Sequence, residues 1–198
     1  LTIEAGGVLE ATQTTFTMAH QTDVYGRFQA TKCDMNHDTW TDIFDGDHPE
    51  QRVNGINVWG GAQGVFINNS FKSVEKRDHS VQYYDDWSAI INAEGSCFLV
   101  IEGCSFESLN LVNGWVTPFG LRMTGDVDAW IRDYTEGETR TRNSFKAFRS
   151  GVGWEFGSAI QRLTLCDFTN CQYNVRMIGN VQRNILLYNQ KQYMDSAI

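Results

Sequence analysis

The sequence from Gly7 to Phe16 reads Gly-Val-Leu-Glu-Ala-Thr-Gln-Thr-Thr-Phe, and the sequence from Gly26 to Met35 reads Gly-Arg-Phe-Gln-Ala-Thr-Lys-Cys-Asp-Met. Placed 19 residues apart, the two stretches share glycine, alanine and threonine at three positions, and apolar residues meet at two more. Internal similarity at a fixed period is the sequence signature of a repeat architecture.

The end of this unit recurs along the whole chain. A small or amide residue, then Ser, Thr or Asp, then Phe or Met, occurs six times and ends at Phe16, Met35, Phe71, Phe106, Phe145 and Phe168. The spacings of 19, 36, 35, 39 and 23 residues indicate a basic unit near 20 residues, lengthened by loops in the middle of the chain. Short apolar alternations separate the triplets, which is typical of strands.

These patterns predict an all-β chain, a right-handed parallel β-helix solenoid with long loop insertions, as a single segment over residues 1–198. One coil cannot bury its apolar side alone, so stacked coils must close a continuous interior. The six large residues are expected to form an internal ladder. A neighbouring column is expected to hold Cys33, Asn69, Cys104, Asn143 and Cys166, with the amides bonding turn backbone and the cysteines filling the same space.

Two other folds are alternatives to the parallel β-helix. A leucine-rich repeat needs a fixed leucine frame and a helical segment in each unit, and the chain has neither. A β-sandwich stays open as the alternative.

The chain also resembles a known family. Residues 1–9 with Thr15-Phe16-Thr17, and residues 55–60 with 64–71, are similar to coils of right-handed β-helix domains in large secreted bacterial surface proteins. The Asn-x-x-Phe endings resemble those of the wider pectate-lyase-like superfamily, which includes phage tailspikes. The resemblance implies an extracellular or cell-surface location and a carbohydrate context, either binding or cleavage.

The net charge and composition limit the classes of partner that the chain is expected to bind. The net charge of −8 and the scattered 16 Lys and Arg argue against a nucleic-acid partner. No run of 18 apolar residues occurs, so no membrane span is expected. The chain is interpreted as part of a longer protein, whose flanking coils would cover its two ends. Five cysteines argue against a complete disulfide framework, although Cys166 and Cys171 could pair.

Three insertions are expected, at about 36–54, 75–88 and 110–141. Together they hold 14 of the 24 acidic residues and four of the six tryptophans. Long loops on a rigid scaffold often carry function. The predicted ligand-binding residues are Trp40, Tyr83, Tyr84, Trp87, Trp115 and Trp130.

The acidic residues of these insertions suggest two further roles. Carboxylates around a flexible glycine are typical of calcium loops, so Asp42, Asp45 and Asp47 form a possible calcium site; otherwise no cofactor is expected. If the chain were an enzyme, paired carboxylates would suit glycoside hydrolysis, and the candidates are Asp85, Asp86, Asp126 and Asp128. The favoured function is an adhesin-like module that binds glycan or a protein partner. The alternative is a polysaccharide hydrolase or lyase, or a tailspike module.

Overall fold

The computed structural model describes residues 1–18, 21–38, 55–75, 89–110, 119–157, 161–164, 166–181, 185–188 and 191–193. These residues form strands joined by turns, and no helix occurs among them. The described part of the chain therefore contains no helical segment with the length and apolar character needed to cross a bilayer. The prediction of an all-β chain is confirmed.

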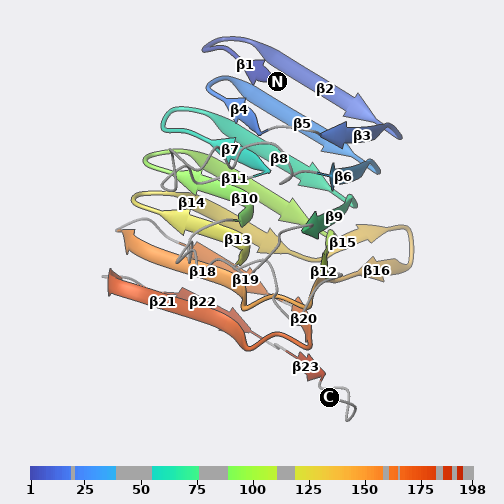
Figure 1. Ribbon diagram of the computed structural model, residues 1–198, viewed down its shortest axis with the longest axis vertical. Helices are drawn as coiled ribbons and strands as arrows, with labels where there is room; N and C mark the ends of the chain where they lie inside the picture. Colours follow the sequence, from blue (N-terminus) through green and yellow to red (C-terminus); the bar gives the residue numbers. More distant parts are fainter. Residues whose placement is uncertain are drawn as a thin grey trace.

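The strands form three parallel sheets of seven strands each and one small hairpin (Figure 1). Sheet A contains β1 (Thr2–Ile3), β4 (Thr22–Val24), β7 (Ile56–Val58), β10 (Ala89–Glu94), β13 (Phe119–Thr124), β18 (Ser150–Gly157) and β21 (Tyr173–Val181). Sheet B contains β2 (Val8–Thr12), β5 (Arg27–Thr31), β8 (Gln63–Ile67), β11 (Phe98–Glu102), β14 (Asp128–Arg132), β19 (Gln161–Thr164) and β22 (Ile185–Tyr188). Sheet C contains β3 (Thr15–Met18), β6 (Asp34–Asp38), β9 (Ser70–Glu75), β12 (Ser105–Asn110), β17 (Asn143–Lys146), β20 (Cys166–Thr169) and β23 (Lys191–Tyr193). The antiparallel hairpin consists of β15 (Tyr134–Glu136) and β16 (Thr139–Thr141).

Consecutive strands enter sheets A, B and C in turn, and we call each set of three a rung. Strands stack on the strands of the next rung in a regular register, with Leu9 opposite Phe28 and Phe16 opposite Met35. The 19-residue alignment of the sequence is thus the stacking register of the first two rungs. The strands of all three sheets pair in parallel. A β-sandwich, the alternative fold, would have antiparallel sheets.

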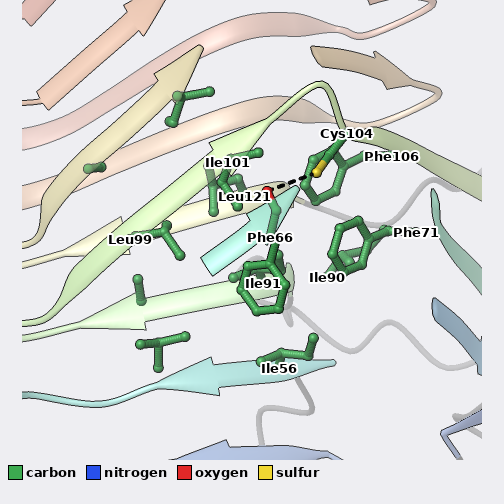
Figure 2. Packing of buried hydrophobic residues seen from close by; sticks show 14 of the residues in the cluster. Ile56, Phe66, Phe71, Ile90, Ile91, Leu99, Ile101, Cys104, Phe106 and Leu121 are labelled. Carbon is green, nitrogen blue, oxygen red and sulfur yellow. Dashed lines mark hydrogen bonds between the residues drawn. The ribbon is translucent and has the colours of Figure 1, made fainter. Parts of the chain in front are cut away.

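The predicted ladder of large side chains is confirmed. Register places its six members opposite one another along sheet C, at Phe16, Met35, Phe71, Phe106, Phe145 and Phe168. The last four rings stack face to face, with centroid distances of 4.7, 4.8 and 5.3 Å. Figure 2 shows Phe71 and Phe106 among buried residues of the other two sheets, including Leu99 and Ile101 of β11 and Ile91 of β10.

The column of amides and cysteines beside the ladder bonds the turns between sheets B and C. Asn69 accepts from the backbone N–H of Cys33 at 2.7 Å and donates to the carbonyl of Ala30 at 2.9 Å. Asn143 accepts from the N–H of Cys104 at 2.8 Å and donates to the carbonyl of Arg132 at 2.8 Å. The amides therefore satisfy buried turn backbone, as the sequence predicted.

All five cysteines are free and buried, including Cys166 and Cys171, so these two do not pair. Buried thiols of this chain donate hydrogen bonds to backbone oxygen atoms. The thiol of Cys104, for example, donates to the carbonyl of Phe66 at 3.3 Å (Figure 2). Burial raises the pKa of Cys97 to about 11 and that of Cys104 to about 12, because an apolar interior disfavours the thiolate. Burial likewise raises the pKa values of Cys166 and Cys171.

Because these buried thiols have raised pKa values, we expect the protein to lose stability in alkaline solution. The unfolded chain releases thiol protons near pH 9, while the folded chain keeps them, so the unfolded state binds fewer protons above that pH. The free energy of unfolding should therefore fall as pH rises from 9 to 11, by up to about 1.4 kcal/mol per pH unit for each thiol. Urea unfolding at pH 8 and pH 10 measures this slope. Cys104→Ala should show a shallower slope, and an identical slope in that variant would contradict the explanation.

The expected insertions differ from the observed elements. Residues 36–38 belong to β6, and Glu75 ends β9, whereas 39–54 and 76–88 lie outside the described residues. Much of 110–141 is sheet, because it includes β13 and β14 of the parallel stack. Gly120 and Arg122 interrupt the apolar alternation of β13, so its strand character becomes evident only from its pairing with β10 and β18.

Candidate functional site

The outer face of sheet A carries aligned polar side chains. Ile56 and Val58 are fully buried in the core, so Asn57 between them points outward. The register of sheet A brings the corresponding residues of four adjacent strands side by side, and with Glu155 they form what we call the polar row: Asp23, Asn57, Asn92, Arg122 and Glu155.

Hydrogen bonds along the polar row run in one direction. Arg122 Nη1 donates to Asn92 Oδ1 at 3.4 Å, and Asn92 Nδ2 donates to Asn57 Oδ1 at 3.3 Å. Asn57 Nδ2 then donates to Asp23 Oδ1 at 3.1 Å. Because each amide both accepts and donates, the row can link a guanidinium at one end to a carboxylate at the other.

Arg122 also forms a buried ion pair with Glu155, with Nη2 2.6 Å from Oε2. Arg122 lies opposite Gly153, and Glu155 is two residues further along the same strand. The side chain of Phe119 lies over Gly153, since an added Cβ would be 2.6 Å from Phe119 Cδ1. The guanidinium therefore reaches diagonally to Glu155. The second carboxylate oxygen of Glu155 is shielded from solvent and has no hydrogen-bond partner among the described residues.

The middle of the polar row is inaccessible. Asn57 and Asn92 are each 2% exposed, Arg122 is 3% exposed and Glu155 is 4% exposed, although all four point away from the core. A buried ion pair costs desolvation and is retained only with good geometry. These four residues therefore have a structural role on the outer face of sheet A. A ligand could contact only the accessible end of the polar row, at Asp23.

An aromatic pair lies beside Asp23 on this outer face. Tyr25 and Trp59 stack with a centroid distance of 6.1 Å and an interplanar angle of 10°. Trp59 Nε1 donates to Asp23 Oδ1 at 3.0 Å, and Gln21 Nε2 donates to Asp23 Oδ2 at 3.0 Å. Tyr25 is 44% exposed, so the pair presents apolar ring surface next to an anchored carboxylate.

The structure places three of the predicted site residues. Trp130 lies in β14, paired with Val100, and is half-buried, with the guanidinium of Arg132 5.2 Å from its ring. Asp126 and Asp128 are exposed at the turn that joins β13 to β14. Trp130 is therefore a strand residue of sheet B, whereas the prediction placed it in a loop.

The other predicted site residues lie outside the described residues: Trp40, Asp42, Asp45, Asp47, Tyr83, Tyr84, Asp85, Asp86, Trp87 and Trp115. They fall in 39–54, 76–88 and 111–118, the segments that link a strand of sheet C to the next strand of sheet A. Within the described part of the chain, no three His, Cys, Asp or Glu side chains are grouped so that they could hold a metal ion.

Sequence reasoning missed the polar row and the aromatic pair. A signal was present, because Ile56-Asn57-Val58, Ile91-Asn92-Ala93 and Leu121-Arg122-Met123 each place one polar residue between two core residues. Aligning these triplets would have placed their polar members in one column of a parallel sheet. Tyr25 and Trp59 directly follow β4 and β7, the strands that carry Asp23 and Asn57 of the polar row.

Comparisons with protein-family models, with curated proteins and with solved structures found no match.

Proposed function

We propose that the chain is a right-handed parallel β-helix of the pectate-lyase-like superfamily. The regular visit of successive strands to three parallel sheets supports this proposal, as do the continuous phenylalanine ladder and the amide column at one set of turns. The sequence resemblance to β-helix domains of secreted surface proteins points the same way.

We further propose that it acts as an extracellular or cell-surface, adhesin-like module that binds glycan on the outer side of sheet A. The observation that carries this proposal is the stacked pair of exposed Tyr25 and half-buried Trp59 beside Asp23. Aromatic faces stack on the apolar face of a sugar ring, and a fixed carboxylate accepts hydrogen bonds from its hydroxyls.

The rest of the binding surface is proposed from the connectivity. The segments 39–54 and 76–88 lead into β7 and β10, and 111–118 leads into β13, all strands of sheet A. The predicted aromatic residues Trp40, Tyr83, Tyr84, Trp87 and Trp115 would extend the platform from there. Asp42, Asp45 and Asp47 of the first segment are the proposed ligands of a calcium ion.

A glycan array with the full chain, run with calcium and with a chelator, tests this function. Tyr25→Ala should weaken binding of any retained glycan about tenfold, or about 1.4 kcal/mol. Tyr173→Ala is the matched control, because Tyr173 is on sheet A and 45% exposed but stands far along the stack, in β21. Equal loss in both variants, or retention of a protein partner alone, would contradict glycan binding at Tyr25.

The same screen distinguishes the alternative, a polysaccharide hydrolase or lyase or a tailspike module. For an enzyme the candidate carboxylates remain Asp85, Asp86, Asp126 and Asp128, because Glu155 is buried in its ion pair with Arg122. Release of shorter sugars that Asp126→Asn or Asp128→Asn abolishes would favour the enzyme, and binding without product favours the adhesin-like module.

A further inference from the structure

A second polar site lies at the turns between sheets B and C, away from sheet A and its Tyr25–Trp59 pair. A pocket of about 380 Å³ opens there. Its lining includes Lys32, Asn68, Ser70, Ser105, Arg142 and Ser144. A volume in this range is typical of small-molecule sites, although most of those are lined by apolar side chains.

Thr141, the last residue of the β15–β16 hairpin, lines this pocket. Figure 1 shows the hairpin projecting from the side of the stack. Between β14 and β17 the chain inserts residues 133–142, where the neighbouring rungs use two residues, such as 68–69 and 103–104. The hairpin fits closely over the turn of the rung before it. Gly103 has φ +60°, and a Cβ there would lie 2.5 Å from Tyr134 Cβ.

Ion pairs hold the hairpin in place. Glu136 accepts a hydrogen bond from Lys32 Nζ at 2.7 Å, across 104 residues of sequence, and this contact raises the pKa of Lys32. At the base of the hairpin, Arg140 pairs with Asp133 and lowers the pKa of that carboxyl group. The pocket is therefore a built feature, formed by an insertion that only this rung contains among the described rungs.

The two cations in the lining already have anionic partners. Lys32 pairs with Glu136, and Arg142 Nη1 lies 3.1 Å from Asp167 Oδ1. Asp34, also in the lining, adds a further negative charge. An anionic ligand would therefore gain little, whereas the unused N–H groups of Lys32 and Arg142 remain donors for neutral oxygen atoms.

The wall of the pocket presents three hydroxyl groups in register. Ser70, Ser105 and Ser144 stand opposite one another on β9, β12 and β17, about 4.8 Å apart along the stack. None of these hydroxyls, nor the amide of Asn68, has a side-chain hydrogen bond to another described residue. Hydroxyl groups both donate and accept, so this surface matches a ligand that carries several hydroxyl groups of its own.

We propose that this pocket binds a single uncharged sugar unit, such as the terminal hexose of a glycan. The site differs from the one proposed at Tyr25 and Asp23, and it contains no aromatic side chain among the residues that line it. Recognition here rests on hydroxyl, amide and ion-paired groups, so selectivity should favour neutral sugars over their acidic counterparts.

Saturation-transfer NMR on the full chain tests the proposal with two probes at millimolar concentration, a neutral methyl hexoside and glucuronate. Inorganic phosphate, which has no carbon-bound proton to observe, is added as a competitor of the hexoside. Methyl glucoside, galactoside and mannoside are used in turn as the neutral probe. At least one should bind, and Ser105→Leu, which fills the pocket without changing charge, should weaken that binding about tenfold or more. Thr15→Leu is the matched control, because Thr15 stands on the same outer face of sheet C, on the strand that pairs with the Asp34 strand, and does not line the pocket.

Each other result has a definite meaning. Binding that Ser105→Leu leaves unchanged, stronger binding of glucuronate, displacement of the hexoside by phosphate, or no binding of any neutral hexoside would overturn the proposal. Thermal melting of Ser105→Leu should match that of Thr15→Leu, which shows that any loss is not unfolding. Tyr25→Ala should leave hexoside binding at the pocket unchanged, so failure of the sheet A proposal and failure of this one are separable.

Discussion

Replacing Phe106 by alanine should lower the free energy of unfolding by about 3–5 kcal/mol. The ring is 1% exposed and lies between Phe71 at 4.7 Å and Phe145 at 4.8 Å, stacked face to face with both. Its removal loses the transfer free energy of the ring and leaves a cavity in the middle of the ladder. A typical domain is stable by about 5–15 kcal/mol, so this one substitution should consume much of the total.

Urea unfolding followed by circular dichroism measures the loss for Phe106→Ala. The matched control is Phe16→Ala, because Phe16 holds the same ladder position in the first rung but is only half-buried. We expect a clearly smaller loss there. Similar losses at the two positions would mean that stacking between rungs contributes little beyond the burial of each ring.

Replacing Glu155 by leucine should destabilise the fold by about 3–5 kcal/mol, because it removes the carboxylate that is paired with the buried guanidinium of Arg122. The two side chains are 4% and 3% exposed and their charged atoms are 2.6 Å apart. The neighbouring Asn92 contact, at 3.4 Å, is neutral and cannot replace the lost charge.

A double-mutant cycle separates the ion pair from the space that it fills. Arg122→Met together with Glu155→Leu should recover most of the loss of the Glu155→Leu variant, since two apolar side chains replace the pair without a buried charge. The exposed pair Lys146–Glu107 is the control, and Glu107→Gln should change stability by less than about 1 kcal/mol. Additive losses at Arg122 and Glu155 would show that the pair is not coupled.

In both proposed sites, a parallel sheet fixes side chains that lie outside the core. Trp59 is held by its hydrogen bond to Asp23 of sheet A, and the three serines are aligned by the register of sheet C. Rigid strands hold such groups more accurately than isolated loops do. The aromatic pair suits a stacked sugar ring, and the pocket suits a ring met edge-on by hydroxyl groups.

Several features could be read from the sequence because the repeat is local. The spacing of Phe16 and Met35 predicted their stacking, and the small or amide residue that begins each triplet predicted the turn column of Asn69 and Asn143. In a stack of rungs, the same position of each unit meets the same position of the next. Periodicity alone therefore determines which core residues are neighbours.

The candidate sites could not be derived in the same way. The strand β13 was expected to belong to an insertion, because Gly120 and Arg122 hide its apolar pattern until β10 and β18 pair with it. The diagonal contact from Arg122 to Glu155 depends on Gly153 lying opposite Arg122, which follows from the register between two strand positions 31 residues apart in the sequence.

By itself, the sequence determined the all-β class, the parallel stacking of near-identical units, the phenylalanine ladder and the place of the amides at the turns. Only the tertiary structure decided the outer faces, where Tyr25 meets Trp59 and where the β15–β16 hairpin reaches back to Lys32. The physical reason is that inward positions are set by a repeated apolar pattern. Outward contacts instead depend on which side chain each rung carries on its outer face and on the length of each insertion, and neither of these repeats along the chain.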